Sequence, residues 1–318
     1  MRFSDIRDQD QAAATLSRAI ASGKVPHAYL FVGPRGVGKR FTATILAAAL
    51  CCDGPAPRPC GGCTHCRKIG ARTHPDVRIL EVPQDKRKIP IEAVREAERW
   101  LGVSPHEVRA KVLIVDPAEE MTDAAANAIL KTLEEPRSGS FIALVTASAS
   151  ALLPTVRSRC QIVRFRPLKA ETVADILAAE GVEPDVARTA AALSGGSLDR
   201  ARQHTGEELG ELLEIVSELL TGAAEQTPSR AMKAAERLRG DRQRTASALE
   251  LALTVLGDRL DADGGPDGAA PAQIAAVHRA LTAMDRNNMN PQLALEGVVM
   301  AIRGRRGLDG SWHRIGGR

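Results

Sequence analysis

Residues 27–40 read HAYLFVGPRGVGKR, and this stretch decides the fold. A short apolar run at 29–32 leads into a glycine-rich loop that ends in Lys39 and is followed by a helical pattern. The order of strand, glycine-rich loop, lysine and helix is that of a Walker A phosphate-binding loop. In such a loop the backbone N–H groups and the helix N-terminus attract phosphate oxygens, and the lysine reaches the β- and γ-phosphates. A glycine-rich turn that binds no ligand is the simpler alternative.

The rest of the first half alternates strand-like and helix-like segments. Short apolar runs follow at 77–82, 112–115, 141–146 and 161–165. Several are almost continuously apolar, as buried parallel strands are. Helical patterns occupy 40–52, 91–101 and 122–135, the last with Thr122 as N-cap and Pro136 as its stop. This alternation predicts an α/β fold with a parallel sheet and crossover helices.

From Pro167 onward the sequence predicts helices and no strand. The helical segments are 171–179, 183–193, 198–204, 207–224, 230–256, 271–284 and 291–303, with a loop at 261–271. The first three are expected to form a small three-helix unit. The predicted domains are an α/β P-loop domain at 1–166, a three-helix unit at 167–206, an all-α domain at 207–304 and a flexible tail at 305–318.

The composition excludes several classes of protein. The 318 residues include 43 Lys and Arg against 39 Asp and Glu, and hydrophobic residues make up 44%. These values fit a globular protein, and the net charge of +4 is too small to identify a nucleic-acid binder. No apolar run reaches the ~18 residues of a membrane-spanning helix, and the first residues lack the apolar core of a signal peptide. We therefore expect a cytoplasmic protein.

The phosphate loop departs from its usual pattern at two positions. A Ser or Thr that ligates Mg²⁺ normally follows the lysine, but here that residue is Arg40. Asp116 ends an apolar strand as a Walker B aspartate does, yet Pro117 stands where a glutamate often activates water, and Glu119 and Glu120 are off that position. We expect no appreciable ATP hydrolysis. The remaining nucleotide site is weak or vestigial and consists of Gly33, Gly36, Gly38, Lys39 and Asp116.

Five of the six cysteines lie between residues 51 and 66. Three of them have the spacing of a metal-binding knuckle, namely Cys60, Cys63 and Cys66, and the fourth thiol comes from Cys51 or Cys52. His65 is a competing candidate, although an exposed position is the interpretation that we favour for it. Four clustered thiolates in a cytosolic chain favour a structural zinc ion. A redox-active dithiol and an iron–sulfur cluster are the alternatives.

Residues 152–161 read LLPTVRSRCQ, which by itself fits a basic turn with Arg157 and Arg159 in solvent. This stretch, however, completes an ordered series of motifs: HAYLFVGPRGVGK, the cysteine knuckle, THPDV, VLIVD, TDAAANAILKTLEEP and LLPTVRSRCQ. The series resembles the bacterial clamp-loader AAA+ proteins of DNA polymerase III. The resemblance covers about residues 1–205.

The resemblance implies an AAA+ P-loop domain with a zinc module at about 51–67, a helical lid and a C-terminal collar that holds a pentamer together. In that family the Ser-Arg-Cys motif supplies an arginine finger to ATP held by a neighbouring subunit, so Arg159 is the implied finger. An ungapped alignment to the family from Gly36 onward assigns the fourth zinc ligand to Cys52.

Within the family, the sequence fits the stator-like delta-prime branch better than the catalytic gamma/tau branch. Arg40 and Pro117 degrade the ATP site, and Asp199 follows the Gly-Ser-Leu turn where catalytic members carry a nucleotide-sensing arginine, with Arg200 displaced by one. The implied partners are gamma/tau and delta subunits in a hetero-pentamer, which reaches the sliding clamp and primed DNA as a complex. The implied cofactor is structural Zn²⁺, and ATP with Mg²⁺ is doubtful in the chain's own site. A catalytic gamma/tau-type ATPase and a zinc-knuckle DNA-binding protein with a vestigial P-loop are the alternatives.

Overall fold

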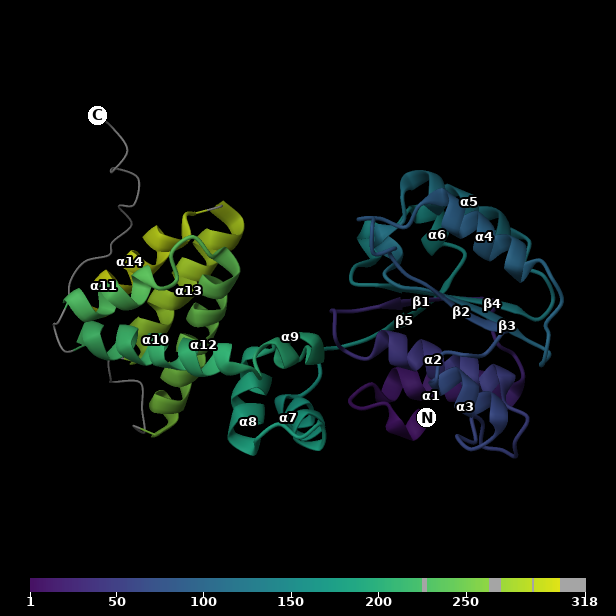
Figure 1. Ribbon diagram of the computed structural model, residues 1–318, viewed down its shortest axis with the longest axis horizontal. Coiled ribbons are helices and arrows are strands. Elements are labelled where there is room, and N and C mark those ends of the chain that lie inside the picture. The colour runs from purple at the N-terminus through teal and green to yellow at the C-terminus, as the bar shows by residue number, and fades with distance from the viewer. Residues whose placement is uncertain (225–227, 263–269, 288, 304–318) are drawn as a thin grey trace. The chain divides into compact units, whose positions relative to one another are not determined.

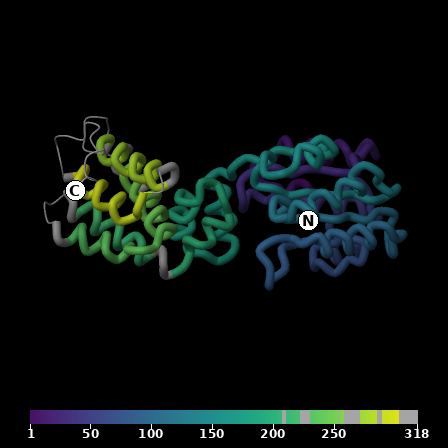
Figure 2. The backbone as a smooth tube through the Cα atoms, turned by 90° about the horizontal axis from the view of Figure 1, so that it is seen from above, coloured from purple at the N-terminus to yellow at the C-terminus, as the bar shows by residue number. Residues whose placement is uncertain are grey.

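The computed structural model describes residues 1–224, 228–262, 270–287 and 289–303. The chain forms two compact units, Met1–Ile176 with Gly195–Asp199, and Leu177–Ser194 with Arg200–Arg318. Figure 2 follows the backbone through both units. The predicted lid at 167–206 is divided between them, and the predicted domain boundaries stay a prediction. The expected tail at 305–318 lies outside the described residues.

The first unit contains a five-stranded, fully parallel sheet with the strand order β2-β3-β4-β1-β5. The strands are β1 (Ala28–Val32), β2 (Val77–Leu80), β3 (Lys111–Val115), β4 (Ser140–Thr146) and β5 (Gln161–Arg164). Leu30 of β1 is paired with Leu144 of β4 on one side and with Ile162 of β5 on the other. Each apolar run expected as a strand is one, so the predicted α/β class is confirmed.

Helices cover both faces of this sheet, as Figure 1 shows. One face carries α1 (Asp10–Ser22), α2 (Lys39–Cys51) and α3 (Thr64–Gly70), and the other carries α4 (Ile91–Leu101), α5 (Asp123–Glu134) and α6 (Pro154–Arg157). Because both faces are covered, β3 is buried along its whole length and its neighbour β4 nearly so. Helices α1 and α3 were not predicted from the sequence, and α3 has only seven residues.

The ends of α5 follow the predicted chemistry. The Oγ1 of Thr122 accepts a hydrogen bond from the backbone N–H of Ala125 at 3.2 Å, as an N-cap does. The helix ends at Glu134, two residues before Pro136. Its inner face buries Ile129 and Leu133 against the sheet, in a core that includes Leu113 of β3. This packing fixes the position of both helix ends relative to the strands.

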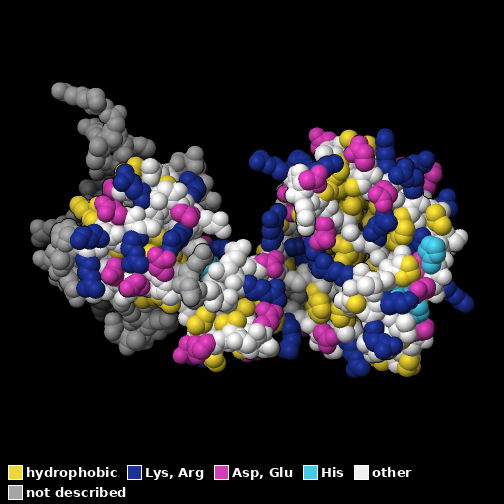
Figure 3. All heavy atoms as spheres, viewed as in Figure 1, with side chains coloured by type: hydrophobic (Ala, Val, Ile, Leu, Met, Phe, Trp, Pro, Cys, Tyr) yellow, Lys and Arg dark blue, Asp and Glu magenta, His cyan; other side chains and the backbone are white. Residues whose placement is uncertain are grey.

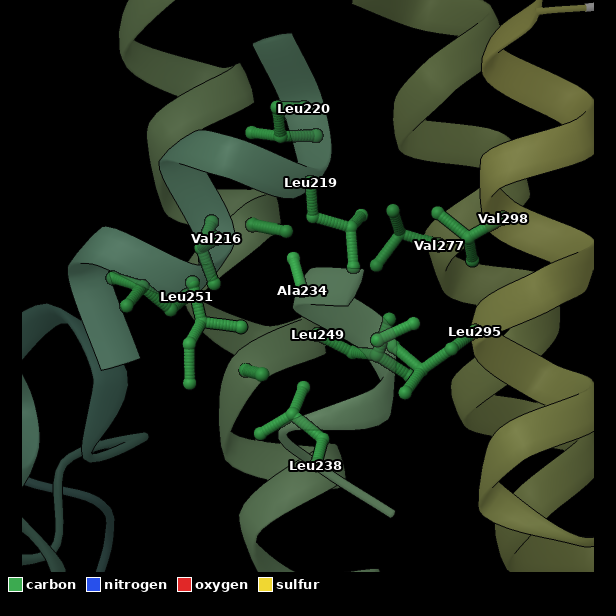
Figure 4. Close-up of a cluster of buried hydrophobic side chains, with 14 of the residues drawn as sticks. Val216, Leu219, Leu220, Ala234, Leu238, Leu249, Leu251, Val277, Leu295 and Val298 are labelled. Atoms are coloured by element: carbon green, nitrogen blue, oxygen red, sulfur yellow. The ribbon is translucent and has the colours of Figure 1, made fainter. Parts of the chain in front are cut away.

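The second unit is helical in every part that the structure describes. Helix α7 (Ala170–Ala179) runs from the first unit into the second, and the other helices are α8 (Pro184–Leu193), α9 (Leu198–Gln203), α10 (Glu207–Ala224), α11 (Pro228–Glu236), α12 (Arg242–Ala262), α13 (Ala270–Asn287) and α14 (Pro291–Arg303). Helices α10 to α14 pack around one hydrophobic core. Figure 4 shows side chains from all of them pointing toward one another, among them Leu219, Ala234, Leu249, Val277 and Leu295.

The prediction of a single helix at 230–256 is wrong. The segment forms two helices, α11 and α12. The chain turns at Gly240, which has a φ of +84°, a conformation that glycine adopts without strain. Asp241 then starts α12 by accepting a hydrogen bond from the backbone N–H of Arg244 at 2.8 Å. Both α11 and α12 contribute to the same core, so the apolar spacing continues across the turn and hides it. The expected loop at 261–271 overlaps the end of α12, and residues 263–269 of it lie outside the described part.

Charged side chains of both signs are interspersed over the visible face of the molecule (Figure 3). On the helical unit, Arg237 pairs with Glu214 at 3.2 Å and with Glu218 at 3.6 Å. Exposed pairs of this kind contribute little to stability. Within the described residues, no helix has both the length and the apolar content needed to cross a membrane.

Candidate nucleotide and metal sites

The loop 33–38 lies at the carboxyl edge of the sheet, between β1 and α2. Strand β1 is flanked by β4 and β5, and the connections that leave β1 and β4 run in opposite directions across the sheet. Ligands of open α/β sheets bind at this kind of switch point. The strand order therefore puts the phosphate loop where a nucleotide would be held.

Lys39 is bound by its own loop. Its side chain is buried, with 6% of its surface exposed, and its Nζ donates to the carbonyl oxygens of Gly33 at 2.7 Å and Pro34 at 2.5 Å. Burial lowers the pKa of Lys39, and the nearby carboxylates of Asp116 and Asp199 oppose that shift. The two loop carbonyl oxygens thus accept the hydrogen bonds that Lys39 would donate to a bound phosphate.

The turn that precedes α9 packs against the same loop. The backbone N–H of Leu198 donates to the carbonyl oxygen of Gly36 at 2.9 Å. A Cβ at Gly36 would collide with the hydroxyl of Ser197 and the backbone nitrogen of Asp199. The Gly-Ser-Leu turn that the sequence singled out therefore contacts the phosphate loop directly, with Asp199 close enough to act on Lys39.

Arg40 occupies the position of the missing Mg²⁺ ligand and pairs with the Walker B aspartate. Its Nε donates to the Asp116 carboxylate, its Nη1 pairs with Glu81, and its Nη2 lies 3.5 Å from the Asp116 carbonyl oxygen. Burial opposes the charge on Arg40, but the bonds to Asp116 and the attraction of Glu81 raise its pKa above the ordinary value. The Asp116 side chain is only 16% exposed, so it pairs with this guanidinium largely out of solvent.

Arg159 lies at the opposite edge of the sheet. It immediately precedes β5, whose first residue Gln161 is paired with Tyr29 near the start of β1, whereas the phosphate loop follows the end of β1. Its Nη2 pairs with Glu134 at 2.6 Å, and its Nη1 donates to the carbonyl oxygen of Thr155 at 2.9 Å. The side chain remains 34% exposed. Strand direction thus separates Arg159 from the loop of its own chain.

The structure brings Cys52, Cys60, Cys63 and Cys66 together, with their sulfur atoms all within 4.8 Å of one another. Each of three backbone N–H groups points at a sulfur: Cys60 to Cys52 at 3.4 Å, Cys63 to Cys60 at 3.3 Å and Cys66 to Cys63 at 3.4 Å. Hydrogen bonds from Gly62 and Cys63 lower the pKa of Cys60 to about 6. Such N–H donors stabilise thiolates, which are the form that binds metal.

The cluster has the size of a tetrahedral thiolate site. Zn–S bonds of about 2.3 Å in a tetrahedron separate neighbouring sulfur atoms by about 3.8 Å. The sulfur atoms of Cys52 and Cys63 lie 3.9 Å apart. Gly54 closes over the cluster so tightly that a Cβ there would lie 2.6 Å from the Cys60 sulfur. The residues present therefore fit such an ion.

Cys51 is not part of this cluster. Its sulfur is buried on the other side of the helix end, 3.9 Å from the carbonyl oxygen of Ala110, and burial raises its pKa to about 12. Cys52 lies one residue further, just beyond the end of α2, and faces the knuckle. The helical phase at the end of α2 therefore separates the two neighbouring cysteines.

A protein-family model described as DNA polymerase III, delta subunit, matches residues 8–169. The chain belongs to this family. The match confirms the predicted resemblance to the delta-prime subunit of the clamp loader. It spans the phosphate loop, the cysteine cluster and Arg159.

The similar proteins include both delta' and gamma/tau subunits of DNA polymerase III. The chain is 32% identical to the DNA polymerase III subunit delta' of Bacillus subtilis over 204 residues, 64% of this chain and 61% of the relative. It is 33% identical to the gamma/tau subunit of Mycobacterium tuberculosis over 228 residues, 70% of this chain and 38% of the relative. The alignments thus cover less than two thirds of either relative. A solved gamma subunit-related protein of Thermotoga maritima superposes with a TM-score of 0.47 at 19% identity, over 91% of this chain and 98% of that one.

The structure adds one residue, Glu119, to the nucleotide edge, although the sequence had set it aside. The Oε1 of Glu119 accepts a hydrogen bond from the backbone N–H of Ala147, just after β4, at 3.1 Å. Its Oε2 is buried and has no hydrogen-bond partner among the described residues. The carboxylate also acts on Lys39. Spacing from Asp116 could not reveal this, because a 3-10 turn at Ala118–Glu120 redirects the chain.

A second group of ligand-type side chains, His65, His74 and Glu107, lies beside the cysteine cluster. The backbone N–H of Asp76 donates to His74 Nδ1 at 3.1 Å, so Nε2 carries the proton of the neutral ring and can donate to His65 Nδ1, 3.0 Å away. Glu107 is occupied by Lys68, at 2.6 Å and 2.7 Å. The group is therefore a hydrogen-bonded support for the cysteine module rather than a metal site.

Proposed function

We propose that this chain is a delta-prime-type clamp-loader subunit that does not hydrolyse ATP itself and supplies Arg159 to the ATP of a neighbouring gamma/tau subunit. The observation that carries the proposal is the ion pair between Arg40 and Asp116. It joins the residue in the Mg²⁺-ligand position to the aspartate that would share that ion. The family match gives the setting, DNA polymerase III.

A bound Mg²⁺ needs oxygen ligands in near-octahedral geometry at about 2.1 Å. The chain offers a guanidinium at the usual hydroxyl position, and that guanidinium takes the Asp116 carboxylate. With Pro117 next to the aspartate, the residue that would activate water is missing as well. Hydrolysis therefore lacks both its metal and its base, while Gly33, Gly36, Gly38 and Lys39 keep a vestigial phosphate loop.

The position of Arg159 supports action on a neighbour's nucleotide. Strands of four to seven residues separate the two edges of the sheet, roughly 15 Å at about 3.3 Å per residue. An arginine side chain does not cover that distance to its own phosphate loop. A guanidinium on an outer edge can instead stabilise the charge on a γ-phosphoryl group held by an adjacent subunit.

We further propose that the four cysteines hold a structural Zn²⁺ ion. Cys52, Cys60, Cys63 and Cys66 would bind it, and the ion would tie the chain after α2 to the start of α3. A closed set of four thiolates leaves no open position for chemistry, as in other structural zinc sites.

The wider assignment follows from the family and is part of the same proposal. The partners are gamma/tau and delta subunits in a cytoplasmic hetero-pentamer, with the sliding clamp and primed DNA bound through the complex. The C-terminal helices, residues 207–304, form the collar, and residues 167–206 form the lid.

The test is Arg159→Ala in a reconstituted clamp loader. DNA-dependent ATPase and clamp loading should fall while the complex still assembles, and unchanged rates would remove the finger. The similarity to a gamma/tau subunit makes a catalytic ATPase the second candidate. Mg²⁺-dependent ATP turnover by the isolated chain would establish it. Tight, steeply salt-dependent DNA binding by the isolated chain would instead favour a zinc-knuckle DNA-binding protein.

A further inference from the structure

We propose that Glu134 is a positioning residue for Arg159: it holds the guanidinium at the amino edge of the sheet with its remaining N–H groups directed at a neighbour's phosphate. This inference rests on the proposed finger role of Arg159. Its starting point is the 2.6 Å pair between Glu134 Oε1 and Arg159 Nη2.

The contacts of Arg159 leave part of the guanidinium available. Nη1 donates to the Thr155 carbonyl oxygen at 2.9 Å and lies 3.2 Å from the Ser158 hydroxyl, and Nη2 reaches Glu134. Within the residues that the structure describes, Nε has no hydrogen-bond partner. Because the guanidinium is a rigid plane, fixing both Nη groups also fixes the direction of the Nε–H. The side chain can therefore meet a phosphate without first losing its rotational freedom.

The location of Glu134 is unfavourable for helix stability and so needs another explanation. It is the last residue of α5, where the carbonyl ends of the helix carry partial negative charge. A carboxylate at this end is disfavoured unless a cation compensates it. The last turn of α5 contains one basic residue of its own, Lys131, but the cation that pairs with Glu134 is Arg159, from the segment before β5.

Glu134 is also well anchored. It follows Leu133, which is 2% exposed and packs in the core beneath α5. Thr155, the other main acceptor for Arg159, belongs to α6, whose Val156 is fully buried in the same core. The two acceptors therefore stand on packed elements, while the guanidinium itself stays 34% exposed. This is the arrangement expected of a preorganised group that acts outside its own chain.

The chain offers a matched control next to Glu134. Glu135 is the exposed C-cap residue of the same helix and makes no ion pair with Arg159. Glu134→Gln and Glu135→Gln remove the same charge from neighbouring positions. A difference between them therefore reports the contact with Arg159 and not the net charge.

The first experiment uses the isolated full chain and does not depend on the finger role. Arg159 modification by phenylglyoxal is followed by peptide mass spectrometry. Glu134→Gln should raise the rate at Arg159 about two- to fivefold, as expected for loss of an exposed pair, and Glu135→Gln should leave it unchanged. Equal rates in the two variants would show that Glu134 does not hold the guanidinium.

The second experiment uses the reconstituted clamp loader with primed DNA. Glu134→Gln should lower kcat for ATP about threefold or more with KM unchanged, since a mispositioned finger affects the transition state. Glu134→Asp should recover part of the rate. If Arg159→Ala leaves kcat unchanged, the finger role falls and this inference with it. If Arg159→Ala lowers kcat but Glu134→Gln does not, or raises it, only the positioning role falls.

Discussion

Two arginines at opposite edges of one sheet have nearly the same exposure, 33% for Arg40 and 34% for Arg159, yet opposite relations to ligands. Arg40 at the carboxyl edge pairs with both Asp116 and Glu81, and Asp116 is the aspartate of the would-be metal site. Among the described residues, Arg159 at the amino edge pairs with one carboxylate, that of Glu134, and keeps N–H groups available. Exposure alone thus says little about function. What matters is which acceptors surround the guanidinium and which edge of the sheet carries it.

The largest effect should come from Arg159→Lys. A lysine keeps the charge but cannot present two parallel N–H groups to a phosphoryl oxygen pair. ATP turnover at the site that Arg159 serves should fall about 10³-fold, the usual worth of an arginine finger. Single-turnover ATPase of the assembled loader measures it, with the same change at Arg157 as control. A lysine variant with full activity would mean that charge alone is needed and would erase the contrast with Arg40.

The second largest effect should come from a substitution in the cysteine cluster. The ion pairs of Arg40 and Arg159 involve no residue of this cluster. Cys60→Ser should abolish zinc binding and lower the free energy of unfolding on the order of 3 kcal/mol. Cys51→Ser should retain the metal, because the Cys51 sulfur faces Ala110. Zinc content and urea denaturation measure both. Zinc loss in the Cys51 variant would move the fourth ligand from Cys52 to its neighbour.

Arg40→Met should destabilise the chain by about 1–2 kcal/mol, because it leaves the largely buried Asp116 carboxylate without its cation. Arg40→Ser places a hydroxyl at the usual position of the Mg²⁺ ligand. Added Mg²⁺ should therefore raise the free energy of unfolding of this variant but not that of the unchanged chain. Arg35→Met is the control, because the Arg35 side chain is 69% exposed and its ion pair with Glu120 is long, at 3.8 Å. If Mg²⁺ stabilises the unchanged chain equally, Arg40 does not occupy the cation position.

The smallest effect should follow Glu119→Gln. The amide keeps an acceptor for the Ala147 N–H and removes a carboxylate whose Oε2 is buried without a partner in the described part of the chain. The free energy of unfolding should change by less than about 1 kcal/mol, and ATP turnover by the loader should stay the same. A large loss of turnover would identify Glu119 as a catalytic base and favour the ATPase alternative.

Much of the first unit could be predicted because local chemistry and tertiary structure agree there. The run 29–32 followed by glycines and Lys39 forms β1 and α2, and Thr122 with Pro136 bounds α5. In the second unit the same reasoning joined α11 and α12, because both helices serve one core and their apolar spacing continues through Gly240. Periodicity reports burial, and it does not report a turn between two buried helices.

The sequence by itself determined the parallel α/β fold, the degenerate phosphate loop and the family, because each of these depends on the order and type of residues along the chain. Tertiary structure decided the rest, because it depends on distances between elements far apart in sequence. Only the folded chain joins Arg40 to Asp116 and Arg159 to Glu134, turns Cys52 toward the knuckle and Cys51 away from it, and brings Glu119 to Ala147. Strand order brings these distant segments together, and it cannot be read from one segment alone.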